Sequence, residues 1–385
     1  MIPPKKHPVY RVGIIGGGRQ GTHHARGFQL NPRTEVVAVA DTDPENLKLF
    51  CERFKCRGYS TYDEMLAKET LDISAPVLPV KANPGAVIAS ARAGVKGIFC
   101  EKPLAATLKD ADAMVEECRK RGIPLAAGLV ISSHLDYRKA YRMAADGTIG
   151  RVLRINLYEQ NHQVGTHGLN LVRKFAGKSE VDYVIGIVEN DPHSDYEEAY
   201  EKDASWYGSI GGYIKFKNGV ECFSSWTGPK WRGIEVIGEK GMIYNWNNTS
   251  LGLRLLKTPE AKDRGDHPEM VEVAGVFKPR TPEHEWDEEG WRLPGEPVVE
   301  TFDALVEAID KRTADLDITT GDDLRHALEI AVALRESARH GSVPVKLPIA
   351  DRSQAMYPEK WRWHYKKDVY GAEWYREQMQ THIRK

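Results

Sequence analysis

Glycines at positions 16, 18 and 21 fill the pattern Gly-x-Gly-x-x-Gly directly after an apolar, strand-like segment. In this context Gly16 permits a tight turn, Gly18 lets the backbone approach a pyrophosphate, and Gly21 lets a helix pack on the strand. The helix that follows would present unsatisfied N–H groups to the phosphates. The spacing therefore predicts a dinucleotide site, and Arg19 and Gln20 within the motif are further candidate cofactor contacts.

An aspartate ends the next strand-like run, EVVAVA, 20 positions after Gly21. At this position Asp41 would accept hydrogen bonds from the hydroxyl groups of the adenosine ribose. A 2′-phosphate would meet its negative charge, and Thr42 is not the arginine that often receives such a phosphate. We therefore expect NAD as the cofactor and regard NADP as less favoured. A glycine-rich turn without ligand, beside a solvated Asp41, is the alternative interpretation.

A second motif, FCEKPLA at 99–105, follows the predicted dinucleotide site. It resembles the Glu-Lys-Pro motif of the Gfo/Idh/MocA oxidoreductase family, and the resemblance extends to 234–241 (IEVIGEKG) and 320–348. It implies that Lys102 lies beside the nicotinamide and the reacting oxygen, where its ammonium would stabilise developing alkoxide character. Other expected cofactor contacts are Pro76, Asn83 and Glu101, although the family often has histidine at position 83.

A further family signature, Asp-x-Gly-x-His-x-x-Asp, corresponds to QVGTHGLN at 163–170. The resemblance implies that His167 is the acid/base residue toward the substrate hydroxyl, a role that suits imidazole because it titrates near working pH. Gln163 and Asn170 replace both carboxylates, and an amide can orient the ring but cannot stabilise imidazolium by charge. Either the His167 imidazolium is stabilised less strongly, or another carboxylate stabilises it. Candidate carboxylates nearby in sequence are Glu189, Asp191 and Asp195.

Several other side chains are candidates with open alternatives. Tyr158, at the end of the alternating segment 151–158, would contact substrate together with Gln163 and Asn170, or be a core or rim aromatic. Trp226 and Trp231 would line a sugar site or an interface between subunits. The histidines at 162, 167 and 193 match no zinc spacing, so we expect no metal. His23 and His24 are expected on the helix surface or at the cofactor edge.

The elements that must position these residues follow from the periodicity of the sequence. Strand-like and helix-like segments alternate over 1–127, which predicts a Rossmann domain with a doubly wound parallel sheet. Period-two segments follow, with an Asn-Gly turn at 218–219, so 128–345 is expected to be an α/β domain with an open, mostly antiparallel sheet. The aromatic segment 346–385 is expected to pack on the body or on a neighbouring subunit.

Composition excludes several classes of partner. A net charge of −1 gives no electrostatic reason to bind nucleic acid, and no apolar stretch approaches the length of a membrane span. The five cysteines are odd in number and contain no CxxC pair, which favours reduced thiols and a cytoplasmic location. The family resemblance implies a homodimer or homotetramer formed through the sheet of the C-terminal domain.

The leading hypothesis is an NAD-dependent oxidoreductase that acts on a hydroxyl or keto carbon of a sugar, cyclitol or glycoside. A second hypothesis comes from THGL at 166–169, which is similar to a segment of the NAD-dependent α-N-acetylgalactosaminidases. Those enzymes oxidise a sugar carbon transiently, eliminate the substituent, add water and return the hydride. A third hypothesis is a non-catalytic NAD-binding regulator, for which neither Lys102 nor His167 would be needed.

Overall fold

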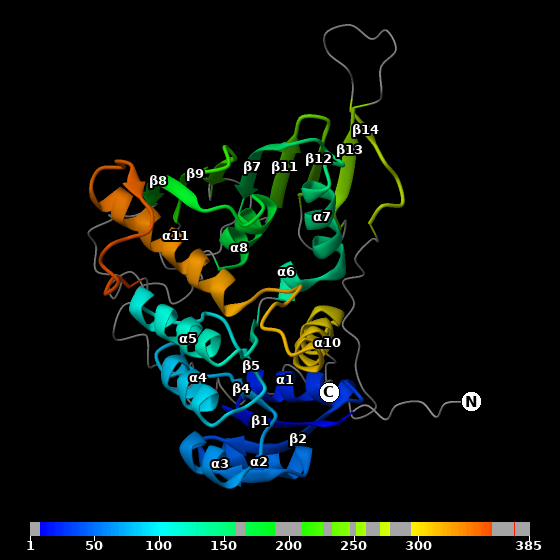
Figure 1. Cartoon of the computed structure of the whole chain (residues 1–385), viewed down its shortest axis with the longest axis vertical. Helices are drawn as coiled ribbons and strands as arrows, with labels where there is room; N and C mark the ends of the chain where they lie inside the picture. Colours follow the sequence, from blue (N-terminus) through cyan, green and yellow to red (C-terminus); the bar gives the residue numbers. More distant parts are fainter. Residues whose placement is uncertain are drawn as a thin grey trace, which may run out of the picture. The chain divides into compact units, whose positions relative to one another are not determined.

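The strands predicted in the N-terminal segment form one parallel sheet in the computed structural model, which describes residues 8–128, 130–158, 166–188, 210–225, 233–246, 252–258, 270–277, 294–355 and 373. The chain divides into two units. The first unit contains Met1–Ser133 and, later in the chain, His284–Arg325. The second unit contains His134–Glu283 and His326–Pro358. Figure 1 shows the helices and strands of both units.

The described residues of the first unit form a six-stranded sheet with strand order β3-β2-β1-β4-β5-β6, and its paired strands are parallel. This order confirms the predicted doubly wound fold. The order in which strands are added reverses between β1 and β4, the point at which such sheets bind ligands beyond their carboxyl ends. The strands are β1 Tyr10–Ile15, β2 Thr34–Ala40, β3 Arg57–Tyr59, β4 Ile73–Pro76, β5 Gly97–Cys100 and β6 Leu125–Ala127.

Helices connect these strands, and several begin at a side-chain cap. Asp43 accepts hydrogen bonds from the N–H groups of Glu45 and Asn46, and Thr61 and Thr107 cap α3 and α5 in the same way. These caps fix where each helix starts and hence where the preceding loop ends. The helices are α1 Arg19–Leu30, α2 Pro44–Phe54, α3 Tyr62–Lys68, α4 Asn83–Arg92, α5 Leu108–Lys120, α6 Val130–Ser133 and α10 Glu296–Lys311.

Helix α10 returns to the first unit from late in the sequence (Figure 1). The fully buried ring of Phe302 stacks on Phe28 of α1 with centroids 3.7 Å apart and meets Phe99 of β5 at 5.0 Å. A Cβ on Gly27 would lie 2.6 Å from Phe302, so this glycine permits the close approach of the helices. The sequence-based boundary that assigned α10 to the second domain is therefore wrong, because its apolar face completes the core of the first unit.

The second unit contains a nine-stranded sheet among its described residues, with order β14-β13-β12-β11-β7-β10-β9-β8-β15. Among the described strands of this sheet, only β7 and β10 pair in parallel, which confirms a mostly antiparallel sheet. The predicted Asn-Gly turn joins β9 to β10, where Gly219 has a φ of 94°. The strands are β7 Val152–Tyr158, β8 Val181–Val188, β9 Ile210–Phe216, β10 Glu221–Ser225, β11 Gly233–Gly238, β12 Gly241–Asn245, β13 Arg254–Lys257, β14 Val271–Glu272 and β15 Val345–Lys346.

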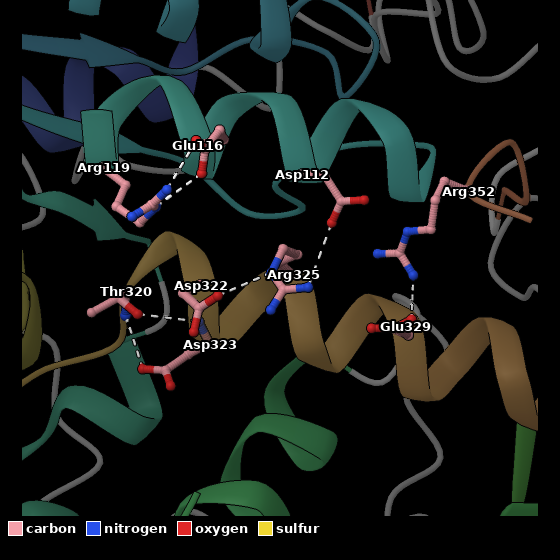
Figure 2. Close-up of polar contacts among 9 residues, drawn as sticks. All are labelled: Asp112, Glu116, Arg119, Thr320, Asp322, Asp323, Arg325, Glu329 and Arg352. Carbon is pink, nitrogen blue, oxygen red and sulfur yellow. Dashed lines mark hydrogen bonds and ion pairs between the residues drawn. The ribbon is translucent and has the colours of Figure 1, made fainter. Parts of the chain in front are cut away.

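Helices α7 Leu135–Ala145 and α8 Thr166–Phe175 lie in the second unit, and α11 Gly321–Arg339 begins in the first. Figure 2 shows the start of α11, where Thr320 and Asp323 cap each other reciprocally at 3.1 Å and Arg325 pairs with Asp112 of α5 at 3.5 Å. Further along α11, Glu329 is buried and forms an ion pair with Arg352. Of the aromatic tail, 346–355 and residue 373 are described, so its predicted packing lies largely outside the described residues.

Candidate functional site

The glycine-rich turn joins β1 to α1. Gly16 has a φ of 98°, and a Cβ on it would collide with the carbonyl oxygen of Val77, just after β4. A Cβ on Gly21 would collide with the carbonyl oxygen of Gly16. The turn can therefore keep this shape only with glycine at both positions, and the ends of β1 and β4 touch through it.

No side chain of the described residues caps the first turn of α1. Its N-cap residue is Gly18, no acidic residue lies in the turn, and Arg19 and Gln20 are its first helical residues. The N–H groups at this helix end are thus not satisfied by a capping side chain, and they carry the positive end of the helix dipole. This end of the helix is suited to an anionic group such as a phosphate.

Asp41 ties the end of β2 to the glycine turn. Its Oδ2 accepts a hydrogen bond from the N–H of Gly17 at 2.6 Å, and its Oδ1 accepts one from the N–H of Asp43 at 2.8 Å. The predicted ribose-binding carboxylate therefore lies against the predicted phosphate-binding turn. The two backbone donors hold it in place.

The loop after β5 is braced by α4. Asn83, at the start of α4, is completely buried, and its Nδ2 donates hydrogen bonds to the carbonyl oxygens of Glu101 at 3.3 Å and Pro103 at 3.0 Å. The N–H of Glu101 donates to the carbonyl oxygen of Pro76, at the end of β4, at 3.0 Å. The partly buried Lys102 lies between these two anchored residues. The structure thus brings Pro76, Asn83, Glu101 and Lys102 together.

His24 is a further member of this cluster, and its contact with Glu101 was not predicted from the sequence. Its Nε2 lies 2.7 Å from Oε2 of Glu101, and only 4% of the residue is exposed. Of the two locations expected for His24, the helix surface is wrong, and the cofactor edge stays a prediction. Its position was readable from helical spacing, because residues 21, 24, 25 and 28 fall on the one face of α1 that is buried.

In the second unit, His167 lies in the first turn of α8 and is partly exposed. Asn170 follows one turn later and is completely buried. Gln163 and the candidate carboxylates Glu189, Asp191 and Asp195 lie outside the described residues, as do Trp226 and Trp231. The group that supports His167 therefore stays a prediction.

Tyr158, expected either to contact substrate or to be a core or rim aromatic, contacts Glu235 of β11. Its hydroxyl donates to Oε2 of Glu235 at 3.2 Å, and Asn156 donates to the same oxygen at 2.8 Å. Burial, and then the Glu235 carboxylate, raise the pKa of the Tyr158 phenol. Strand alternation places Tyr158 and Asn156 on the opposite sheet face from the buried Ile155 and Leu157. We therefore assign Tyr158 to the outer face of the sheet.

In the described part of the chain, no three His, Cys, Asp or Glu residues are grouped so that they could hold a metal ion. None of the helices in the same residues combines the length and the apolar character needed to cross a membrane.

The parallel sheet, the glycine turn and the carboxylate after β2 define a dinucleotide-binding Rossmann domain. Residues 10–129 match the Gfo/Idh/MocA family model, described as an oxidoreductase family with an NAD-binding Rossmann fold. The chain is 32% identical to myo-inositol 2-dehydrogenase of Thermotoga maritima over 272 residues, which cover 66% of this chain and 80% of that protein. The chain belongs to the Gfo/Idh/MocA family of oxidoreductases, as its Glu-Lys-Pro motif indicated.

Two further comparisons cover different parts of the chain. The 2,7-anhydro-N-acetylneuraminate hydratase of Mediterraneibacter gnavus is 32% identical over 140 residues, 36% of this chain and 37% of that protein. The crystal structure of aldose-aldose oxidoreductase from Caulobacter crescentus aligns with a TM-score of 0.66 at 22% identity, covering 88% of this chain and all of that one (100%). The second comparison shows the shared fold.

Proposed function

We propose that this oxidoreductase transfers hydride between NAD and a hydroxyl-bearing carbon of a sugar, cyclitol or glycoside. The observation that carries the proposal is the position of Lys102 at the carboxyl edge of the parallel sheet. Gly16 packs against the backbone of Val77, just after β4. The carbonyl oxygen of the neighbouring Pro76 accepts a hydrogen bond from the N–H of Glu101, beside Lys102. The relationship to myo-inositol 2-dehydrogenase supports a polyhydroxylated substrate.

The residues of the first unit fit NAD. Gly16, Gly18 and Gly21 form a turn with no room for side chains at its first and third positions, beside the uncapped end of α1. The buried Oδ1 of Asn83 has no hydrogen-bond partner among the described residues, so an acceptor is left for a donor such as the nicotinamide carboxamide. The turn with Arg19 and Gln20 would contact the phosphates, and Asp41 would contact the adenosine ribose. The nicotinamide-side contacts would be Pro76, Asn83, Glu101 and Lys102.

Two side chains would handle the substrate oxygen and its proton. NAD, when bound, accepts hydride from the substrate carbon or returns it. The Lys102 ammonium would donate a hydrogen bond to the reacting oxygen and stabilise negative charge on it. His167 would take the hydroxyl proton during oxidation and return it during reduction. Gln163 and the buried Asn170 would orient the imidazole or the substrate through their amides.

A redox-neutral reaction is a second candidate, favoured by the relationship to 2,7-anhydro-N-acetylneuraminate hydratase and by the THGL segment. A sugar carbon would lose hydride to NAD and become a ketone, which acidifies the neighbouring C–H. Loss of that proton and of the adjacent substituent would give an enone. Water would add to the enone, and the hydride would return to the ketone. The sum is exchange of the substituent for water with no net change in NAD.

One experiment tests both candidates. The protein is incubated with NAD and a panel of free sugars, cyclitols and aryl glycosides, while NADH absorbance is followed and products are identified by mass spectrometry. A dehydrogenase yields NADH together with a product two hydrogens lighter than its substrate. A redox-neutral enzyme releases the aryl alcohol without net NADH. If the protein binds dinucleotide but forms neither product across the panel, both candidates are contradicted. This is the result expected for a non-catalytic NAD-binding regulator.

We also propose that the outer face of the nine-stranded sheet joins subunits. This face exposes Phe223 by 45% and Ile187 by 50%, and the guanidinium of Arg154 lies 5.2 Å from the centre of the Phe223 ring. Tyr213 meets the same ring edge-on at 5.2 Å. Exposed aromatic and aliphatic side chains with a neighbouring arginine are typical of interface cores.

A further inference from the structure

The buried imidazole of His24 has no role in the chemistry proposed above, yet it lies next to the residue that precedes Lys102. The His24 side chain is 5% exposed and the Glu101 side chain 14% exposed, with 2.7 Å between Nε2 and Oε2. A carboxylate offers only acceptors, so Nε2 must carry the hydrogen that joins the pair. Charge-assisted hydrogen bonds of this kind are short and strong when shielded from water.

The imidazole is itself held in place by aromatic rings. Phe99 of β5 lies against it with centroids 4.7 Å apart, and Phe302 of α10 meets it nearly perpendicularly at 6.1 Å. The Nδ1 atom is buried with no hydrogen-bond partner among the described residues. The ring is therefore positioned by packing and by one hydrogen bond, and that bond goes to Glu101.

The Glu101 carboxylate is confined from the other side by Gly128. A Cβ on Gly128 would collide with Oε2 of Glu101, and it would approach the carboxyl carbon to 3.1 Å. Gly128 has no positive φ, so this space is the structural reason for glycine at that position. His24 and Gly128 thus both confine the carboxylate in the orientation that the structure shows. In that orientation Oε1 makes no hydrogen bond within the described part of the chain.

We propose that His24 is a positioning residue: it fixes Glu101 so that Oε1 accepts a hydrogen bond from the nicotinamide half of the cofactor. The donor would be a ribose hydroxyl or the carboxamide of that half. The inference rests on the proposed function, because it assumes that the nicotinamide reaches the end of β5. A carboxylate already held in its binding orientation loses little conformational entropy when the cofactor arrives.

The test compares His24→Leu with His24→Gln. The Gln side chain can place an amide N–H near the position of Nε2, whereas Leu has a similar size and no donor. The dissociation constants of NADH and of ADP are measured by fluorescence and calorimetry. We expect His24→Leu to raise the dissociation constant of NADH ~10-fold, as for loss of one hydrogen bond to a charged group, and to leave that of ADP unchanged. His24→Gln should restore most of the NADH affinity.

Gly128→Ala provides a second variant that displaces the same carboxylate without touching His24. It should weaken NADH binding to a similar extent, and the double variant with His24→Leu should be little worse than either alone, because both act on one group. Ser90→Ala is the matched control. It removes a buried 2.8 Å hydrogen bond to Ser74 in the same unit and should leave both affinities unchanged.

The outcomes separate the inference from the proposed function. Equal NADH affinity in the wild type, His24→Leu and Gly128→Ala would overturn the inference. A parallel loss of ADP and NADH binding would also overturn it, because that result indicates general damage to α1. If the wild type binds ADP but not NADH, the proposed function fails instead. Thermal melting identifies any variant that does not fold. If either His24→Leu or Gly128→Ala fails to fold, the NADH affinity of the other variant tests the inference.

Discussion

The amide nitrogen of Asn83 donates to the carbonyl oxygen of Pro103 at 3.0 Å, and so it fastens the start of α4 to the loop that carries Lys102. We predict that Asn83→Ala lowers kcat by up to ~100-fold, because small displacements of a catalytic group have effects of that size. Asn31→Ala is the control, since Asn31 makes comparable 2.7 Å bonds to Asp303 and to the N–H of Arg33 away from this loop. Similar losses of kcat in both variants would contradict the assignment.

Lys102→Met should reduce hydride transfer by ~100- to 1,000-fold, since removing one donor to a developing oxyanion has effects of this size. The uncharged side chain fills similar space, so NADH should still bind. Single-turnover absorbance measurements give the rate of hydride transfer directly. Lys96→Met serves as the control, because Lys96 pairs with Asp72 at 2.7 Å on the surface of the same unit. Undiminished transfer in Lys102→Met would remove the proposed role.

Asp41→Asn should shift the cofactor preference toward NADP. The substitution removes the negative charge that would repel a 2′-phosphate, and it weakens the acceptor for the ribose hydroxyls. We expect kcat/KM with NAD to fall ~10-fold and the ratio of NADP to NAD activity to rise, since hydrogen bonds to charged groups contribute about 1.5–3 kcal/mol. Asp43→Asn keeps the cap of α2 and should leave the ratio unchanged. A constant ratio in Asp41→Asn would place the ribose elsewhere.

The fold should lose stability at alkaline pH. Burial raises the pKa of the Cys56 and Cys118 thiols to about 12, above their values in the unfolded chain. The folded state therefore holds these protons more tightly, and the stabilisation is complete below about pH 8.5 and is lost as pH rises toward 12. Each thiol should contribute about 1.4 kcal/mol per pH unit in this window. Urea unfolding at pH 8 and pH 10 measures the difference, and equal free energies of unfolding would contradict it.

Phe223→Lys should break the proposed subunit contact on the outer face of the nine-stranded sheet. A charged group in the centre of an apolar contact must be desolvated, which opposes association. Light scattering after gel filtration should show a smaller assembly than for the wild type. Leu49→Lys, at a side chain 52% exposed on α2, should leave the assembly unchanged. A monomeric wild type would refute the proposal outright.

The sequence was most informative where one physical requirement dominates. The buried strands β1, β2 and β5 read as apolar runs, and the glycine turn was readable because the backbone conformations it needs favour glycine. Strand β8 was not predicted, because its half-exposed pattern is weak outside its tertiary context. The face on which Tyr158 lies follows from the alternation that the buried Ile155 and Leu157 define, whereas its location at a strand end does not reveal that face.

The residues His24 and Phe302 show what sequence reasoning lacked at the site. Helical spacing puts His24 on the buried face of α1, but its partner Glu101 is 77 positions away. Phe302 is more distant still, and nothing local reveals that α10 closes the aromatic cluster of the first unit. Pairings of this kind depend on the whole topology, which single-sequence periodicity does not encode.

The late return of α10 has a consequence for biosynthesis. While the ribosome is still translating the second unit, the groove between Phe28 and Phe99 has no Phe302 to fill it. The nascent Rossmann segment therefore lacks this part of its core until more than 300 residues have been made, as the position of Phe302 in the sequence requires. A recombinant piece cut at residue 129, where the family model ends, would carry this open groove permanently and tend to self-associate through it.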